Sequence, residues 1–276
     1  MYQRIPAYAR FQWLNAAKLR KILAPFFRYR GRGRRGYDQV TLFLWLGYKQ
    51  LHDCSYRDLE SMSGIDHTTF IKFRSRLKSR SPHLFGVLVA RTVTSLDRLD
   101  LILDSSFVET YSRHDEEGSG YSGYKEKNGF KLHEIIDRKS RLPVFQVVTS
   151  GNIADITMGE ALVARAPPHL PVCSFAADKG YDSEYFAQSI LLKWKIRPAI
   201  PVRHMRHDGN ALNRTTEQRN RSRSKRVYRG RTEIERYFSR KKHVFNLGEE
   251  KTRHLENFRT NCYFTSCLEL LESLST

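Results

Sequence analysis

The sequence predicts an α/β protein in which an all-α region precedes a mixed sheet flanked by helices. A basic N-terminal arm is followed by helical patterns that begin at Val40 and continue to residue 98. Three consecutive strand patterns begin at Leu99, and helix and strand patterns alternate after them, an order typical of a mixed sheet with helices on its faces. We therefore expect a helical region over residues 1–98 and a sheet domain over residues 99–276.

The positive charge of the chain is concentrated in two segments. The formal net charge is +19 over 276 residues. Residues 1–36 contain ten Lys or Arg and no acidic residue, and residues 203–254 contain sixteen against six, whereas residues 37–202 are almost balanced. Concentrated positive charge is typical of proteins that bind a polyanion. We expect the partner to be nucleic acid.

A membrane is the competing partner for a basic protein, and the sequence argues against it. No apolar run approaches the roughly 18–20 residues that span a bilayer, and residues 1–10 lack the apolar core of a signal peptide. The four cysteines form no CxxC pair, which indicates buried free thiols in a reducing compartment. We expect a cytoplasmic, nucleoid-associated protein with no membrane partner.

The basic N-terminal arm ends in a run of aromatic, Arg and Gly residues over positions 26–36. Aromatic and cationic side chains in alternation suit base stacking and contact with the phosphate backbone. We expect Arg28 and Arg30 to contact DNA; the alternative is a solvated basic linker.

After a buried helix over residues 40–48, the pattern indicates two short helices joined by a turn. Ser55 and Asp66 are candidate N-caps, and Gly64 is the candidate turn residue. Such a pair resembles a helix-turn-helix, whose second helix enters the major groove, although many helical hairpins touch no DNA. The second helix points Phe70, Phe73 and Leu77 inward, and its outward candidates for DNA contact are Lys72, Arg74 and Arg76, with Thr69 beside them.

A breaker over residues 79–83 predicts a linker before the next helix, at residues 84–98. Strands are expected at residues 99–104, 130–136, 144–149, 172–177 and 196–202, the second and third joined by a hairpin turn at residues 137–141. Helices are expected at residues 156–165, 183–193, 229–245 and 256–274, and loops at residues 118–129 and 203–225.

Two aspartates follow apolar strand patterns. Asp104 ends the first strand and Asp178 ends the strand at residues 172–177. Ligands of α/β sheets gather at the carboxyl ends of strands, so we expect both carboxylates in one site. With Glu235 they supply the hard oxygen ligands of a two-metal centre for phosphodiester chemistry. Taken singly each has another explanation: an Asp after a strand often caps a turn, and Asp182 or Glu233 could take the place of a proposed ligand.

Tyr228, Arg231, Glu235 and Lys242 are separated by 3, 4 and 7 residues. These offsets place them near one face of a helix. A carboxylate surrounded by cations suits a site that holds a metal against phosphate.

The same four residues match, in identity and spacing, the Tyr-x2-Arg-x3-Glu-x6-Lys signature of DDE transposases of insertion sequences, in families four and five, and the chain resembles that branch over about residues 99–260. Other blocks of the family are matched by Leu103–Ser106, by Gly129–His133, by Thr149–Asn152 with Asp155, and by Asp178, Gly180 and Tyr181.

The resemblance implies an RNase H-like catalytic domain in which Asp104, Asp178 and Glu235 ligate two Mg²⁺ or Mn²⁺ ions. It implies that Tyr228 and Arg231 engage phosphates near the transposon end and that Lys242 holds the terminal DNA. Glu235 follows Asp178 by 57 residues, which leaves no room for the large β-rich insertion of some relatives.

The expected function is that of a DNA transposase. It would cleave at the ends of an insertion sequence and transfer the 3′ hydroxyl into target DNA. Its partners would be the terminal inverted repeats and target DNA, bound by a homodimer because two ends must be brought together. The alternatives are an RNase H-fold nuclease that cuts without joining and a DNA-binding relic without catalysis.

Overall fold

The computed structural model describes residues 16–27, 36–93, 96–110, 116–201, 225–247 and 253–275. Contacts divide the chain into two compact units. The first contains Met1–Thr92, Lys241–Glu249 and Arg259–Thr276, and the second contains Val93–Arg240 and Glu250–Phe258. The chain therefore passes between the units more than once, and the division into residues 1–98 and 99–276 stays a prediction.

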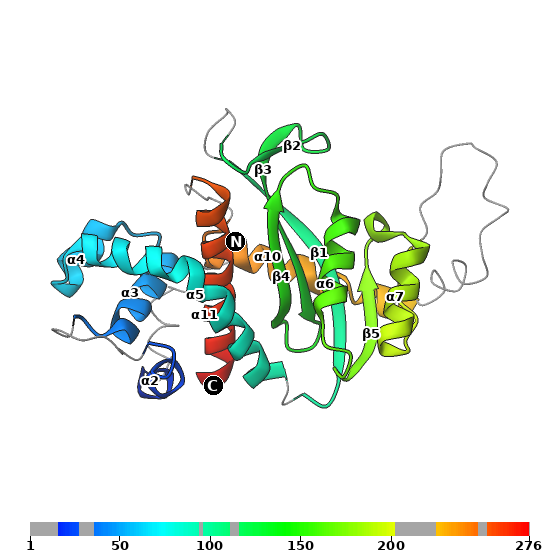
Figure 1. Cartoon of the computed structure of the whole chain (residues 1–276), viewed down its shortest axis with the longest axis horizontal. Coiled ribbons are helices and arrows are strands. Elements are labelled where there is room, and N and C mark those ends of the chain that lie inside the picture. The colour runs from blue at the N-terminus through cyan, green and yellow to red at the C-terminus, as the bar shows by residue number, and fades with distance from the viewer. Residues whose placement is uncertain are drawn as a thin grey trace, which may run out of the picture. The chain divides into compact units, whose positions relative to one another are not determined.

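The first unit is helical. It contains α2 (Ala16–Leu23), α3 (Gln39–His52), α4 (Tyr56–Ser63) and α5 (His67–Val93), which are labelled in Figure 1. The expected buried helix over residues 40–48 is confirmed by α3, whose N-cap Asp38 accepts hydrogen bonds from the N–H groups of Val40 and Thr41. Such a cap satisfies N–H groups that the first turn of a helix leaves without partners.

The predicted caps of the next two helices are also confirmed. Ser55 forms a capping box with Asp58 at the start of α4, and Gly64 ends α4 at a left-handed φ of 69°. Asp66 accepts a hydrogen bond from the Thr68 N–H at the start of α5. Phe70, Phe73 and Leu77 are buried, as their spacing predicted.

The predicted linker at residues 79–83 is wrong, because α5 continues through it to Val93. Pro82 lies inside the helix, and its ring is on the exposed side. The buried stripe of Leu77, Leu84 and Leu88 continues past the proline. Burial of this stripe stabilises the helix across the one hydrogen bond that proline removes.

Aromatic side chains form the core of the first unit. The ring of Phe43 lies 5.5 Å from that of Phe27 and 4.9 Å from that of Phe264, measured between centroids. Phe264 belongs to α11 (Leu255–Ser275). The last part of α11 therefore packs in the helical unit although it follows the sheet in the sequence.

The second unit is built on a mixed sheet, as the sequence predicted, and this sheet has five strands. The strands are β1 (Leu99–Glu109), β2 (Gly120–Ser122), β3 (Lys127–Asp137), β4 (Pro143–Ser150) and β5 (Val172–Ala177). β3 pairs antiparallel with β1, β2 and β4, and β1 pairs parallel with β5. The turn between β3 and β4 is the predicted hairpin turn.

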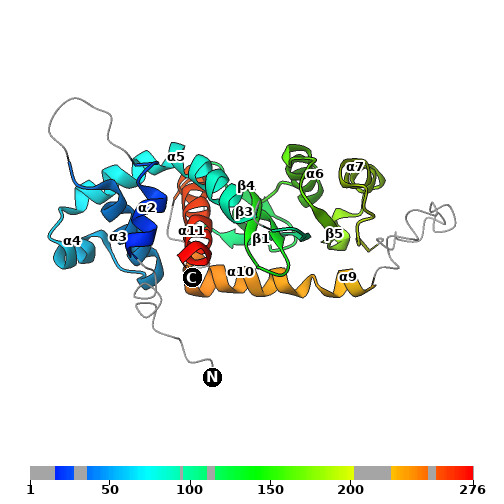
Figure 2. The same cartoon turned by 90° about the horizontal axis from the view of Figure 1, so that it is seen from below.

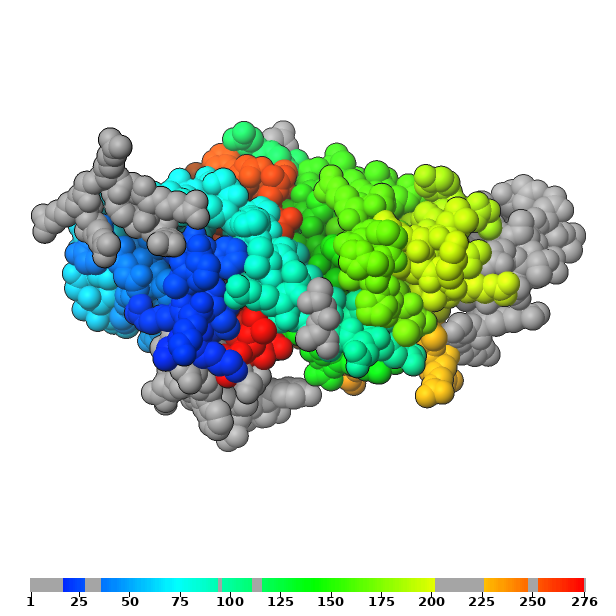
Figure 3. All heavy atoms as spheres, turned by 60° about the horizontal axis from the view of Figure 1, so that its bottom comes forward, coloured from blue at the N-terminus to red at the C-terminus, as the bar shows by residue number. Residues whose placement is uncertain are grey.

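Helices cover both faces of this sheet. Figure 2 shows α6 (Asp155–Arg165) and α7 (Glu184–Trp194) on one face, with α9 (Lys225–Arg229) and α10 (Thr232–Val244) on the other. In Figure 3 the side chains of α6 and α7, green to yellow, form the outer surface of their layer. The three-residue turn η1 (Lys179–Tyr181) follows β5.

Several predicted boundaries in the second unit are wrong. β1 does not end at Asp104 but continues to Glu109, because it pairs with β3 over that length. The loop expected at residues 118–129 contains β2 and the start of β3. The strand expected at residues 196–202 is reduced, over its described part, to one bridge between Ala176 and Ala199, and Pro198 beside it has no N–H for a ladder.

The helix expected over residues 229–245 is interrupted. α9 ends at Arg229, Gly230 and Arg231 form a turn, and α10 begins at Thr232. Gly weakens a helix because its backbone has the most freedom to lose. The loop expected over residues 203–225 lies outside the described residues except at its last position, which begins α9.

The four cysteines are free thiols, as predicted. Cys262 and Cys267 are buried, whereas Cys54 is half-buried and Cys173 is exposed, so the expectation of burial is wrong for Cys173. Within the described residues, no helix is long and apolar enough to cross a bilayer.

Candidate active site

Asp104 and Asp178 lie beside each other at the end of the parallel pairing between β1 and β5. The last paired residues of these strands are Leu103 and Ala177, which face each other. Asp104 follows Leu103 directly in the sequence, and Asp178 follows Ala177. The prediction that two carboxyl strand ends bring these aspartates together agrees with this register, although β1 continues beyond Asp104 along its other neighbour, β3.

The carboxylate of Asp104 is held in a site that disfavours its ionised form. Its side chain is 18% exposed. Burial raises the pKa of Asp104 to about 6, against the lowering effects of the Ser105 N–H and the Arg231 guanidinium, and the negative charges of Asp178 and Asp155 raise it further. The ionised form of Asp104 is therefore disfavoured mainly because the carboxylate is buried, in spite of its pairing with Arg231.

Arg231 joins Asp104 to Glu235. Its Nη1 lies 2.9 Å from Oδ2 of Asp104, and its Nη2 lies 2.7 Å from Oε1 of Glu235. Burial alone would lower the pKa of Arg231, but the charges of Asp104 and Glu235 raise it. The turn between α9 and α10 places this guanidinium where carboxylates from a strand and a helix meet.

Glu233, the other glutamate of this segment, has different partners. Its carboxylate is paired with Arg141 at 2.8 Å and with Arg236 three residues later. Of the two glutamates, Glu235 is therefore the one that Arg231 connects to Asp104. The choice of Glu235 over Glu233, which the sequence based on spacing, agrees with these contacts.

Asp178 is the N-cap of η1. Its Oδ1 accepts a hydrogen bond of 2.6 Å from the Gly180 N–H. The ring of Tyr181, at the end of this turn, is fully buried. A Cβ at Gly159 of α6 would lie 2.9 Å from this ring and 3.0 Å from Leu103, so only a glycine there leaves room for it. Burial first, and then the charges of Asp155, Asp104 and Asp178, raise the pKa of Tyr181 far above its usual value.

Asp155, at the start of α6, is a fourth acidic residue whose charge acts on the centre, and the sequence analysis did not propose it as a site residue. Its Oδ1 pairs with Lys131 at 3.0 Å and lies 3.8 Å from Nδ1 of the buried His133. Burial lowers the pKa of His133 to about 4, so the ring is neutral near neutral pH. The signal that could have identified Asp155 was its position in the stretch of sequence that resembles the transposase family.

Tyr228 and Lys242, the other two residues of the signature, lie on α9 and α10. Both are half-buried. Because Gly230 and Arg231 interrupt the expected helix, the single helical face predicted for the four residues is wrong. Glu235 and Lys242 do share α10, seven residues apart.

The candidate DNA contacts of α5 differ in their surroundings. Lys72 and Arg76 line a pocket of about 740 Å³ in the helical unit, together with Thr69 and Tyr37. Arg74 is half-buried, and its guanidinium donates to the side chain of Asn261 on α11. Lys72 and Arg76 are therefore the exposed members of the three. Arg28 and Arg30 lie outside the described residues.

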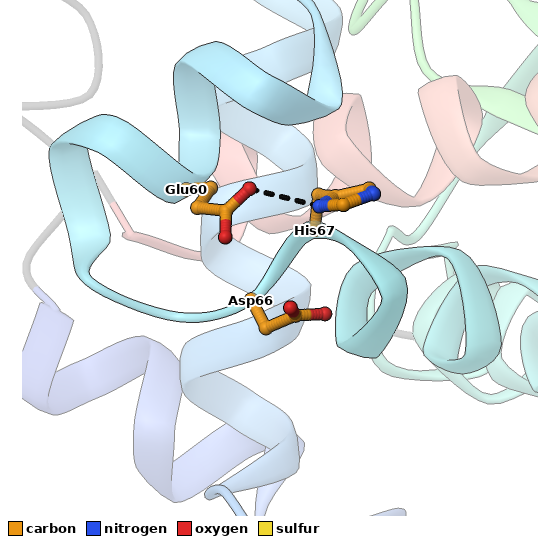
Figure 4. A group of neighbouring side chains, drawn as sticks. All are labelled: Glu60, Asp66 and His67. Atoms are coloured by element: carbon orange, nitrogen blue, oxygen red, sulfur yellow. Dashed lines mark hydrogen bonds and ion pairs between the residues drawn. The ribbon is translucent and has the colours of Figure 1, made fainter.

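A separate group of possible metal ligands lies at the turn between α4 and α5. The ligand atoms of Glu60, Asp66 and His67 all lie within 4.8 Å of one another, which holds for no other such group in the described parts of the chain. Figure 4 shows the Glu60 carboxylate directed at the His67 ring, to which it is bonded at 2.8 Å. Asp66 accepts a hydrogen bond from the Thr68 N–H as the cap of α5. These contacts stabilise the turn between α4 and α5 and explain why the three side chains lie together.

Asp104, Asp178 and Glu235 fit a divalent ion in two respects. They offer the hard carboxylate oxygens that Mg²⁺ prefers. The raised pKa of Asp104, caused by burial and by neighbouring carboxylates, indicates an electrostatic environment that an added cation would relieve. Asp104 and Glu235 are separated by the Arg231 guanidinium rather than closed on one point.

Comparison with known proteins matches residues 95–268 to the family described as the transposase DDE domain, which covers more than half of the chain. No curated protein sequence matches it significantly. Among solved structures, the chain is similar to the piggyBac transposase in a cryo-EM structure of its synaptic complex with hairpin DNA. The two chains are 13% identical, the match covers 99% of this chain and 74% of the other, and the TM-score is 0.42.

Proposed function

We propose that this chain, which belongs to the family of transposases with a DDE domain, cleaves DNA at the ends of an insertion sequence and transfers the freed 3′ hydroxyl into target DNA. The Tyr-Arg-Glu-Lys signature supports its place in the branch of families four and five. The mixed sheet, with β5 parallel to β1 and the other strands antiparallel, supports an RNase H-like catalytic domain.

The observation that carries the proposal is the meeting of carboxylates from distant parts of the chain. Asp104 and Asp178 follow two residues that face each other across the β1–β5 pairing. Arg231 connects Asp104 to Glu235, which comes from α10. Acidic side chains of this kind, gathered from strand and helix, suit metal-dependent phosphodiester chemistry.

Asp104, Asp178 and Glu235 would hold two Mg²⁺ or Mn²⁺ ions. When bound, these ions would stabilise the charge that develops on the phosphate oxygens. Asp104 must be ionised to act as a ligand, and its pKa of about 6 leaves it ionised above that pH. The Arg231 guanidinium presents two N–H groups beside the carboxylates, in the geometry that binds a phosphate through paired hydrogen bonds.

The two steps are both exchanges at phosphorus. In the first, water attacks the phosphorus at the end of the element, and the bond to the 3′ oxygen breaks to leave a 3′ hydroxyl and a 5′ phosphate. In the second, the 3′ hydroxyl attacks a target phosphodiester, and the 3′ oxygen of the target strand leaves. Tyr228 and Arg231 would hold phosphates near the transposon end, and Lys242 would hold the terminal DNA.

The helical unit is proposed to bind double-stranded DNA. The capped pair α4 and α5 supports a helix-turn-helix, and the exposed Lys72 and Arg76 support contact with the phosphate backbone. Arg74, Arg28 and Arg30 complete the proposed contacts. Bringing the two terminal inverted repeats together with target DNA would require a homodimer, which we place in the cytoplasm at the nucleoid.

A cleavage assay on a supercoiled plasmid that carries the flanking DNA of the gene tests the proposal. We expect Asp104→Asn, Asp178→Asn and Glu235→Gln each to abolish Mg²⁺-dependent cleavage while leaving DNA binding intact. Glu233→Gln is the matched control on the same helix and should retain cleavage. Full cleavage by the Glu235→Ala protein would contradict the assignment.

Strand transfer separates a transposase from a nuclease of the same fold. Pre-cut duplex ends are incubated with a target plasmid and Mg²⁺. Joined products support the transposase, whereas cleavage of the plasmid substrate without joining of pre-cut ends indicates a nuclease.

A further inference from the structure

We infer that Arg231 exchanges partners during assembly of the active complex: it neutralises Asp104 and Glu235 in the DNA-free protein, and passes to a DNA phosphate when a divalent ion takes its place between them. Metal binding and DNA binding would then strengthen each other. This inference rests on the proposed function, because it assigns the same carboxylates to the metal. It makes Arg231 a positioning residue in addition to a DNA contact.

The contacts of Arg231 are the first support. The two Nη atoms of one guanidinium are paired with two carboxylates that come from different elements, β1 and α10. Both distances, 2.9 Å and 2.7 Å, are those of charge-assisted hydrogen bonds. A cation that ligates Asp104 and Glu235 would need the same oxygens, so the ion and the guanidinium compete for them.

The charge balance of the centre is the second support. Asp104 and Asp178 adjoin across two strands, and Glu235 approaches through Arg231. Asp155 already has a cationic partner, Lys131, at 3.0 Å. The one charge of Arg231 is paired with two of these carboxylates, whereas a divalent ion brings two charges to the same place.

The accessibility of Arg231 is the third support. Its side chain is 21% exposed, so it reaches solvent while it holds both carboxylates. It sits in a two-residue turn between α9 and α10, where its N–H donates to the Tyr228 carbonyl and its carbonyl accepts from the Ile234 N–H, so the side chain is the part that can change partners. A planar guanidinium binds a phosphate as well as it binds a carboxylate. A DNA phosphate beside the turn can therefore accept the hydrogen bonds that the carboxylates give up.

The two binding events are then linked. A phosphate that withdraws Arg231 leaves Asp104 and Glu235 without that counter-charge and raises their affinity for the ion. By reciprocity, the ion raises the affinity for DNA by the same factor. The protein would hold its metal weakly until a DNA end is bound, which limits cleavage to the assembled complex.

Binding of Mn²⁺ to the DNA-free protein, followed through the electron paramagnetic resonance of the free ion at mildly alkaline pH, tests the exchange. We expect Arg231→Gln to bind Mn²⁺ about tenfold more tightly than the wild type, because a competing charge is removed. Arg141→Gln is the matched control. It removes a guanidinium that is paired with Glu233, which lies on the same helix as Glu235, and it should leave Mn²⁺ affinity unchanged. Arg231→Lys keeps the positive charge but loses the paired N–H groups of the guanidinium. Its Mn²⁺ affinity should lie between that of the wild type and that of Arg231→Gln.

A duplex taken from the DNA that flanks the gene, with pre-cut ends, provides the second measurement. It should raise the Mn²⁺ affinity of the wild type and leave that of Arg231→Gln unchanged. Unchanged or weaker Mn²⁺ binding by both Arg231 variants, while the Asp104→Asn protein loses it, would overturn the exchange and leave the proposed function standing. If Asp104→Asn and Glu235→Gln bind Mn²⁺ as the wild type does, the proposed metal site itself fails.

Discussion

Asp104 and Arg231, which are 127 positions apart in the sequence, form an ion pair of 2.9 Å between the centre of the sheet and the turn before α10. The pair gives Asp104 a positive neighbour, yet the pKa of Asp104 is still raised to about 6, mainly because the carboxylate is buried. The ionised form of this buried carboxylate remains disfavoured in spite of the neighbouring guanidinium. That is the electrostatic environment expected of a ligand for a cation of higher charge.

The raised pKa of Asp104 predicts how the stability of the metal-free protein depends on pH. Because the folded-state pKa of about 6 exceeds the ordinary value of 3.8, the fold disfavours the ionised form. This penalty is absent below the ordinary value, grows as the pH rises between the two values, and is complete above the folded-state pKa. Asp104→Asn should therefore stabilise the protein in EDTA by on the order of 2 kcal/mol near neutral pH.

Urea unfolding in EDTA at a series of pH values measures this effect. The stabilisation by Asp104→Asn should vanish in acid, where the wild-type carboxyl is protonated in both states. A difference between the two proteins that does not change with pH would contradict the assigned pKa.

Gly159 is predicted to be necessary for the position of Tyr181. The added Cβ of Gly159→Ala would lie 2.9 Å from the Tyr181 ring and 3.0 Å from Leu103, and both of these side chains are fully buried. We expect a loss of about 1–3 kcal/mol in thermal or urea unfolding, as for other overpacked cores. Because Tyr181 ends the short turn η1, which Asp178 caps, a displaced Tyr181 should also displace Asp178, and Mn²⁺ affinity should fall as well.

Gly86 provides the control for that substitution. It also lies in a helix, α5, but a Cβ built there has no neighbour within 4 Å. Gly86→Ala should stabilise the protein by about 0.5–1 kcal/mol through the lower backbone entropy of the unfolded chain. Equal effects of the two substitutions would show that the contact with Tyr181 does not matter.

The contribution of Lys241 to the stability of the helical unit is predicted to depend on its buried neighbour Glu269. Its fully buried Nζ donates to Ser266 Oγ at 2.6 Å and lies 3.9 Å from the buried Glu269 carboxylate. Lys241→Met leaves Glu269 without this cation, and the loss should be about 3–5 kcal/mol in the free energy of unfolding. The double variant Lys241→Met with Glu269→Leu should recover most of it, and failure to recover would argue against the pair.

Lys72 and Arg76 are predicted to contribute to DNA affinity through phosphate contacts. Replacing each with Ala should weaken binding to duplexes of any sequence and lower the slope of log affinity against log salt by about 1 per residue. Fluorescence anisotropy over a salt series measures both quantities. Lys78→Ala removes an exposed charge six residues after Lys72 and is the matched control; an equal effect of this variant would indicate only the general charge of the protein.

Local sequence patterns were sufficient to predict the ends of α4, the start of α5 and the strand β5. Ser55, Gly64 and Asp66 were identified as helix ends because capping depends on the residue type and on backbone geometry within a few positions. The strand at Val172–Ala177 was recognisable because it is a short apolar run between polar segments. Each of these features is decided by neighbours in the chain.

Two of the errors share a cause, which is that distant partners overrode local preference. Pro82 predicted a break, but the buried stripe on either side of it keeps α5 continuous. β1 passes beyond Asp104 because β3, which follows later in the chain, pairs with it from Leu101 to Glu109. The strand expected at residues 196–202 was missed for a local reason: its described part, which contains Pro198, forms one bridge.

The chain alone was enough to propose the acidic residues and to show the resemblance to the DDE transposases, because residue types, spacing and the order of elements are local properties. The relation between those residues depended on the fold. The parallel register of β1 and β5 sets Asp104 beside Asp178, and the turn at Gly230 aims Arg231 at both Asp104 and Glu235. Burial of Asp104 and the resulting rise of its pKa arise from residues that are distant in the sequence, so they emerge only when these residues are packed together.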